Sequence, residues 1–438
     1  MATARRMNIG SPQASAFTDE VKPESAAIVS EILQDDLENH HIFFGPNKSR
    51  NQLSIKTLTL YALGATSEEL LTTYNSNKKN HDPALPVDEY VVLAMSDKNK
   101  FKDFLGDDAN YPHFLEFFQR EIESKGLENT IREHLLARDE HANGLLVRMF
   151  SGFMHPLIRF GFGIEWGQPA LVASSLAESS IQEPIVGEYL LRAERTADGL
   201  PEDKKTSDAI GLLDRIRDDE KLRGAAQWTD ISKMRDGILK RAPDEINKYA
   251  SQYSVRPDRL DEAVAQMINA VAYMTGGAQN PPKQVKFDFA FIHALTASVF
   301  FQSINSLACL TTADKVRLLE WKVRCDMSMY AAHNAPKLVL SPIINYEDER
   351  DWRTMFDIII KRPEEDVHTA KTLRAIANGQ KICAPFEKGG RDRGFFLVDS
   401  MWLKMANLLI DSLNNEQPWV AMSGFEQAWL HMQNQSGM

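Results

Sequence analysis

Residues Phe153 to Glu165 read FMHPLIRFGFGIE, an apolar run punctuated by glycine that nevertheless carries a histidine, an arginine and a glutamate. A buried imidazole or guanidinium costs several kcal/mol unless it is paired or hydrogen-bonded. The stretch therefore predicts either a satisfied structural network or the lining of a cavity.

Apolar residues recur at helical spacing on both sides of this stretch, along most of the chain. We expect helices near residues 25–37, 53–63, 111–123, 131–136, 144–158, 169–181, 260–273, 287–307, 313–332, 351–360, 367–377 and 395–413. There is no strand-like alternation with hairpin turns, and no GxGxxG motif follows a strand. The pattern predicts a mostly α fold, a single large multi-helix body enclosing a central ligand cavity.

Composition along the chain suggests how this body is organised. Residues 1–24 are polar and rich in Ala, Ser and Pro, which predicts a flexible tail. Residues 25–438 then form the helical domain, with loop chemistry at 74–87. Residues 195–260 are the most charged part and are predicted to form a solvated insertion or peripheral helical hairpin.

The overall balance is that of a globular protein, with 43% hydrophobic and 25% charged residues among 438 and a formal charge of −11. No block of basic residues interrupts the acidic balance, so nucleic acid and anionic membranes are not expected partners. Three separated cysteines form no CxxC motif, and no signal peptide or run of 18 apolar residues is visible. We expect a cytoplasmic protein with a small-molecule partner; the sequence predicts no oligomeric state.

Histidines divide into two groups by their surroundings. Six lie in polar segments and are expected to be ordinary surface or capping residues: His40, His81, His113, His134, His141 and His431. Five lie in or beside apolar helices: His41, His155, His293, His333 and His368. Each of these five could be a satisfied core histidine, but their number favours convergence of some on one pocket.

His368 and Lys371 are three residues apart on a predicted helix, where they share a face, and Asp366 is placed to cap that helix. A buried amine could act as a base, a nucleophile or, after carbamylation, a metal ligand. The alternative is an ordinary surface helix start. His155, His293 and His368, with Lys371, could ligate non-haem iron, although Arg159 would repel a dication.

Four ordered motifs resemble the questin oxidase-like family of fungal secondary metabolism. They are LYALGA at 60–65, HPLI to GFGIE at 155–165, the segment 289–296 around His293, and DVHTAK at 366–371. The resemblance spans most of residues 25–412. It implies a mostly helical oxidoreductase that modifies or cleaves an aromatic polyketide ring by Baeyer-Villiger-like or dioxygenase chemistry, with NADPH or non-haem iron as a possible cofactor.

The chain departs from the family pattern where relatives carry further histidines. The family's His-Asn-His-x-x-His-His is RNQLSIK at 50–56 here, and Arg159 and Gln182 stand where histidines are expected. If those histidines bind metal in relatives, part of the metal site is lost. We therefore expect no tightly bound cofactor.

Together these observations predict a biosynthetic enzyme in which His155, Arg159, His293, His368 and Lys371 carry the chemistry. We predict substrate contacts from Gln52, Tyr61, Phe162, Trp166 and Gln182. Arg159 is expected to anchor negative charge on the substrate, the alternative being an ion pair with Glu165 that braces the fold. Two other functions stay open: a metal-free cyclase or isomerase, and a non-catalytic small-molecule binder.

Overall fold

The chain folds almost entirely into helices, which confirms the predicted fold class. The computed structural model describes residues 1–10, 21–347, 350–363, 367–413 and 419–434. Within these ranges the strands are two residues long and form two small sheets. β1 (Phe43–Phe44) pairs antiparallel with β2 (Ser49–Arg50), and β3 (Phe287–Asp288) pairs parallel with β4 (Trp419–Val420).

Two compact units make up the chain. Unit 1 comprises residues 1–184, 300–311 and 356–374, and unit 2 comprises residues 185–299, 312–355 and 375–438. Helix α21 (Trp352–Ile360) runs from unit 2 into unit 1, and α22 (Val367–Cys383) runs from unit 1 into unit 2.

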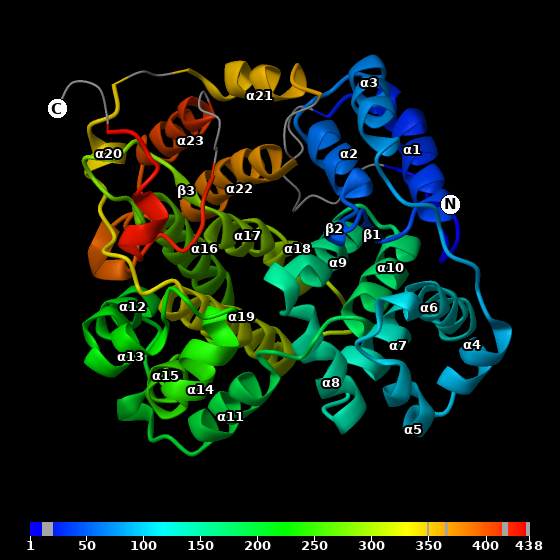
Figure 1. The fold of residues 1–438 in the computed structure, drawn as a ribbon, viewed down its shortest axis with the longest axis horizontal. Coiled ribbons are helices and arrows are strands. Elements are labelled where there is room, and N and C mark those ends of the chain that lie inside the picture. Colours follow the sequence, from blue (N-terminus) through cyan, green and yellow to red (C-terminus); the bar gives the residue numbers. More distant parts are fainter. Residues whose placement is uncertain (11–20, 348–349, 364–366, 414–418, 435–438) are drawn as a thin grey trace. The chain divides into compact units, whose positions relative to one another are not determined.

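Unit 1 is built around α10, which packs against α6 on one side and α9 on another, while α1, α2 and α3 pack on one another (Figure 1). Its complete helices are α1 (Ala26–Asn39), α2 (Leu53–Ala62), α3 (Ser67–Lys78), α4 (Glu89–Met95), α5 (Lys98–Phe101), α6 (Tyr111–Lys125), α7 (Leu127–Ile131), α8 (Glu140–Met149), α9 (His155–Glu165), α10 (Pro169–Ser180) and α18 (Phe301–Asn305).

Two glycines explain how α9 reaches the centre of unit 1. A Cβ atom at Gly161 would lie 2.1 Å from the Phe300 side chain, and one at Gly163 would lie 2.8 Å from Val172 of α10. Both positions are thus too tight for any side chain. Every residue of α9 is buried as a result, including its charged ones.

The helix expected over 144–158 is interrupted. α8 ends at Met149, and Phe153 and Met154 adopt left-handed conformations with φ of 57° and 60°. A new helix then begins at His155, where Pro156 stands in the first turn, a favoured position for proline. The break turns the chain before α9 and sets His155 at a helix start. The helix expected at 287–307 is likewise two helices in the structure, one of them α18.

The predicted N-terminal tail is wrong for residues 1–10, which are packed on unit 1. Ala4, Met7 and Ile9 are buried. Arg5 donates to Glu116 and Glu123 of α6 at 2.8 and 2.9 Å. The burial of these apolar residues offsets the ordering cost that the polar composition suggested. Residues 11–20 of the same segment lie outside the described residues.

Unit 2 is organised along α19, which packs with α11, α12, α15, α16 and α17. Its complete helices are α11 (Gly187–Asp198), α12 (Ala209–Asp218), α13 (Glu220–Ala225), α14 (Leu239–Arg241), α15 (Pro243–Ala250), α16 (Leu260–Gly277), α17 (Phe289–Ser298), α19 (Thr312–Ala332), α20 (Ser341–Ile344) and α23 (Met401–Ser412).

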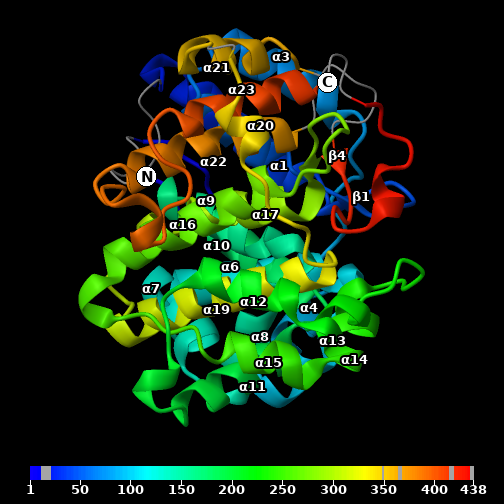
Figure 2. The ribbon, with the colours of Figure 1, turned by 90° about the vertical axis from the view of Figure 1, so that its left-hand side faces the viewer.

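The charged segment 195–260 contains more helix than the predicted hairpin. Helices α12 to α15 lie close together in unit 2 (Figure 2). α12 buries Ile210, Leu213 and Ile216 while its arginines and aspartates face outward. The high charge therefore belongs to the outer faces of amphipathic helices.

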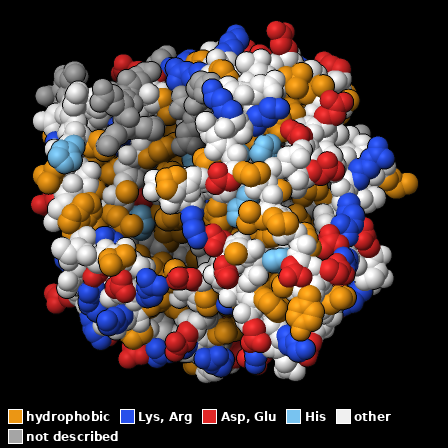
Figure 3. All heavy atoms as spheres, turned by 45° about the vertical axis from the view of Figure 1, so that its right-hand side comes forward, with side chains coloured by type: hydrophobic (Ala, Val, Ile, Leu, Met, Phe, Trp, Pro, Cys, Tyr) orange, Lys and Arg blue, Asp and Glu red, His pale blue; other side chains and the backbone are white. Residues whose placement is uncertain are grey.

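Surface charge is mixed on the face drawn in Figure 3. Acidic and basic side chains are interspersed there among the described residues. That face presents no extended basic patch of the kind a nucleic-acid backbone would need.

Candidate active site

Helix α22 presents three ionisable side chains in a row. His368, Lys371 and Arg374 follow one another at three-residue intervals, so they lie along one face of the helix. All three are buried, and Lys371 is only 2% exposed. The surface-lysine alternative is therefore excluded. We call these three residues the α22 row; Asp366, the expected cap of the helix, lies outside the described residues.

Gln52 connects two members of the row. It is the residue before α2, and its Oε1 accepts a hydrogen bond from Lys371 Nζ at 2.5 Å. Its Nε2 lies 3.5 Å from Nε2 of His368. Gln52, predicted to contact substrate, thus joins a buried polar chain with the two predicted catalytic residues.

His155 lies beside the first member of the row. It is the first residue of α9, and its ring centroid is 6.4 Å from that of His368, with the rings nearly perpendicular. The structure therefore brings together His155, His368, Lys371 and Gln52 within unit 1.

The side chains of this region can be compared with the ligands that a non-haem iron centre requires. The usual facial triad of such oxygenases combines two histidines with a carboxylate. Among the described residues, no carboxylate is grouped with the imidazoles of His155 and His368 as a further ligand. Iron of the facial-triad type does not fit this set of side chains.

Arg374, the last member of the row, forms an ion pair that the sequence analysis missed. Its Nη2 donates to Oε1 of Glu165 at 2.6 Å, and its guanidinium lies over the ring of Phe162 at 5.5 Å. Both charged side chains are at most 2% exposed. Within the described part of the chain, Oε2 of Glu165 and Nε of Arg374 have no hydrogen-bond partner. The sequence feature that could have indicated Arg374 is its three-residue spacing from Lys371, which places both on one face of the helix.

Of the aromatic residues predicted to contact substrate, Phe162 lies against Arg374 at this end of the row. Phe162 packs on Phe300 with centroids 4.7 Å apart. Trp166, next to Glu165, packs on Tyr61 at 5.3 Å. All four rings are buried. The ion pair of Arg374 thus lies beside a buried aromatic ring, away from water, where electrostatic interactions are strong.

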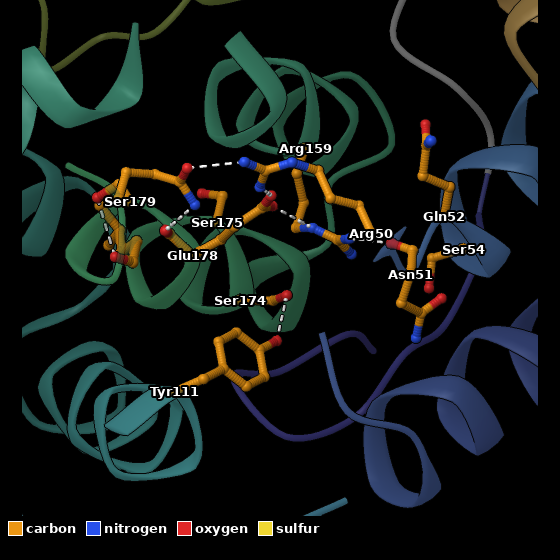
Figure 4. A network of polar contacts seen from close by, with 12 residues as sticks. Arg50, Asn51, Gln52, Ser54, Tyr111, Arg159, Ser174, Ser175, Glu178 and Ser179 are labelled. Atoms are coloured by element: carbon orange, nitrogen blue, oxygen red, sulfur yellow. Dashed lines mark hydrogen bonds and ion pairs between the residues drawn. The ribbon is translucent and has the colours of Figure 1, made fainter. Parts of the chain in front are cut away.

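Arg159 belongs to a second buried network, drawn in Figure 4. Its Nε donates to Oε2 of Glu178 at 2.9 Å, and its Nη2 donates to the carbonyl of Asn51 at 2.7 Å. Nη1 of Arg50 donates to the other oxygen of Glu178 at 2.7 Å. The suggested Arg159–Glu165 pair is wrong, because Arg159 pairs with Glu178 of α10 and Glu165 pairs with Arg374.

Gln182 also lies in this second network rather than in the row. Its Oε1 accepts from Arg50 Nη2 at 2.7 Å, and its Nε2 donates to the carbonyl of Glu178. We call Arg50, Arg159, Glu178 and Gln182, with Asn51, the arginine network. Both oxygens of Glu178 have partners within it.

In the arginine network, burial and neighbouring charges shift the pKa values of the arginines. Burial is the largest effect on Arg159 and lowers its pKa, but Glu178, Tyr111 and Asp36 together outweigh burial, so the pKa is raised. For Arg50 burial is the stronger effect and the pKa is lowered. Burial also raises the pKa of the neighbouring Tyr111 to about 12, and its hydroxyl lies 2.9 Å from Oγ of Ser174.

His293 belongs to unit 2. It is buried in α17, and its Nδ1 lies 2.6 Å from the carbonyl of Phe289. In the same unit, the buried His333 lies 2.9 Å from Asp288. That His293 shares a pocket with His155 and His368, or binds metal with them, stays a prediction.

A second histidine cluster in unit 1 corrects the expectation for His134. This residue is buried, with Nε2 at 3.0 Å from Glu121 and Nδ1 at 2.8 Å from Nε2 of His141. Glu121 and Glu133 could join it around a metal ion. However, Lys125 Nζ donates to both carboxylates, at 2.5 and 2.8 Å, so the chain supplies its own cation there.

Among the described helices, none is long and apolar enough to cross a membrane.

Comparisons with known proteins agree with the resemblance in the motifs. The family model described as questin oxidase-like matches residues 49–376. A questin oxidase of Aspergillus fumigatus is 32% identical, covering 98% of this chain and 99% of that protein. A Baeyer-Villiger monooxygenase of a Cryptosporiopsis species is 32% identical, covering 93% and 94%, and a Baeyer-Villiger oxidase of Emericella nidulans is 32% identical, covering 94% of each. The chain belongs to the questin oxidase-like family.

Proposed function

We propose that this chain is an oxidoreductase of secondary metabolism that opens or modifies an aromatic polyketide ring by inserting one oxygen atom beside a ring carbonyl. Relatives named questin oxidase or Baeyer-Villiger oxidase match it along nearly its whole length, which supports the reaction class. The ring ketone becomes a lactone. One atom of dioxygen enters the product, and the other leaves as water with two electrons and two protons from a reductant.

The observation that carries the proposal is the α22 row in its apolar surroundings. An oxygen insertion of this type develops negative charge on oxygen, and preorganised donors in a site without water stabilise such charge. Lys371, held by Gln52 at 2.5 Å, is placed to donate to that oxygen. His155 and His368 are the groups we assign to proton transfer. His293 is proposed to assist them.

Within this proposal Arg159 has a different role from the predicted substrate anchor. Its bonds to Glu178 and Asn51 favour a bracing function. Tyr61, Phe162 and Trp166 are proposed to contact the aromatic substrate.

The cofactor is left to experiment. Family resemblance implies NADPH as the electron donor, and we propose that it binds transiently. Metal analysis of the purified protein tests the expected lack of tightly bound iron. Near-stoichiometric iron in protein produced without added metal would contradict that expectation.

Turnover of a hydroxyanthraquinone under isotopically labelled dioxygen, with NADPH supplied, tests the reaction itself. We expect one labelled oxygen atom in a ring-opened or lactone product. An unlabelled isomer of the substrate would instead indicate the cyclase or isomerase. Tight binding without any conversion would indicate the non-catalytic binder.

A further inference from the structure

The ion pair between Glu165 and Arg374 contains one hydrogen bond where two could form. An arginine and a carboxylate commonly meet side-on, through two parallel hydrogen bonds. Arg317 and Glu194 of unit 2 do so, at 2.7 and 2.9 Å. Glu165 and Arg374 share one bond at 2.6 Å, which leaves a carboxylate oxygen and an Nε–H unpartnered among the described residues.

Leaving these two atoms unpartnered is costly. A buried donor or acceptor without a hydrogen bond destabilises a fold, and a charged group does so more strongly. Both side chains are at least 98% buried, so bulk water does not compensate. Buried polar atoms of this kind can bind a polar group that comes from outside the chain.

The hydrogen-bonding chemistry of the two unpartnered atoms limits which polar group of a ligand can bind to both. Nε of Arg374 can only donate, and the ionised Oε2 of Glu165 can only accept. A hydroxyl satisfies both, because it accepts one bond and donates another. A carbonyl or an ether oxygen would leave Oε2 unpartnered, and a phenolate would be repelled by the carboxylate.

The surroundings favour an aromatic hydroxyl over a bound water. The ring of Phe162 lies under the Arg374 guanidinium, and Trp166 follows Glu165 in the chain and packs on Tyr61. An aromatic ring beside the ion pair suits a flat apolar ligand ring that carries one polar group.

We propose that Glu165 and Arg374 form a binding site for a neutral phenolic hydroxyl of the substrate and thereby fix the orientation of its ring along the α22 row. The proposal rests on the proposed function, whose substrate class it sharpens. It places the hydroxyl beside Arg374, at the opposite end of the α22 row from His368.

The test compares a β-hydroxyanthraquinone with unsubstituted anthraquinone, which lacks the hydroxyl but adds no bulk. For the unaltered protein we expect the hydroxylated compound to bind roughly tenfold to a hundredfold more tightly in a fluorescence titration. In Glu165→Gln the side-chain oxygen stays on Arg374 and an NH2 group faces the ligand. The preference should then fall to about threefold or less, since the hydroxyl loses its acceptor.

Glu194→Gln is the matched control, because it makes the same change in a side-on pair of unit 2. It should keep the preference of the unaltered protein. If Glu165→Gln fails to fold, Arg374→Lys takes its place, since it keeps the charge but removes the Nε donor, and it too should reduce the preference.

Equal binding of the two compounds by the unaltered protein would overturn the inference and leave a bound water as the occupant. An unchanged preference in folded Glu165→Gln would also overturn it. Binding with the expected preference but no turnover would refute the proposed function alone, because the titration does not depend on catalysis.

Discussion

Unit 1 contains two buried polar regions that differ in how completely they are satisfied. In the arginine network both oxygens of Glu178 accept from guanidinium groups, one from Arg50 and one from Arg159. At the end of the α22 row, Glu165 of α9 uses only one oxygen on Arg374, whose Nε is unpartnered within the described residues. A satisfied network fixes structure, whereas an unsatisfied one keeps capacity for a ligand. We therefore infer that the first region braces unit 1 and that the second performs its chemistry.

The largest expected effect comes from breaking the arginine network. Glu178→Gln should lower the free energy of unfolding by about 3 to 5 kcal/mol, since it leaves two buried guanidiniums without their counter-charge. Urea denaturation followed by circular dichroism measures this. Turnover per folded molecule should stay close to normal. A mutant as stable as the unaltered protein would remove the distinction between the two regions.

Removing the ammonium group of the row should instead affect activity. Lys371→Met is expected to lower kcat by roughly a hundredfold or more, in line with the loss of a proton-transfer or charge-stabilising group. Steady-state kinetics would show it, with Tm as the check on folding. Lys286→Met, at a buried lysine of unit 2 bonded to the Ser412 carbonyl, serves as the control and should retain kcat. Equal kcat values for the two mutants would contradict the assignment.

A smaller effect is expected from the histidine pair beside α6. Burial, with the nearby His134 and Lys98, lowers the pKa of His141 to about 4, while Asp139 and Glu133 oppose the shift. In the unfolded chain His141 takes up a proton near pH 6.5, whereas in the folded chain it does so only near pH 4. The free energy of unfolding therefore decreases as the pH falls from 6.5 toward 4. Because the ring is partly exposed, we expect about 1 kcal/mol.

His141→Gln should flatten this part of the stability profile, measured by urea denaturation at several pH values between those limits. A slope identical to that of the unaltered protein would mean that His141 does not titrate as described.

Much of the fold follows from local sequence signals. α2 (Leu53–Ala62) and α10 (Pro169–Ser180) closely match the helices expected near residues 53–63 and 169–181. The break before α9 was missed because Phe153 and Met154 adopt left-handed conformations that their side chains disfavour. α3 was missed because its polar composition resembles a loop, although Thr66 and Glu69 form a capping box at its start.

The candidate site was predictable where its residues share one helix. His368 and Lys371 could be paired by spacing alone, and both are buried as the functional hypothesis requires. Ion-pair partners could not be chosen in this way. Arg159 and Glu165 lie on the same helix, α9, yet each pairs with a helix that only tertiary packing brings close, α10 and α22 respectively.

The central claim is that the α22 row acts on the substrate while Arg159 holds unit 1 together. Arg159→Met, compared directly with Lys371→Met, tests it in one experiment that measures kcat and the free energy of unfolding for both proteins. We predict that Arg159→Met loses several kcal/mol of stability and keeps most of its kcat, whereas Lys371→Met shows the opposite pattern. A collapse of kcat in a stable Arg159→Met protein would contradict the account and restore Arg159 as the substrate anchor.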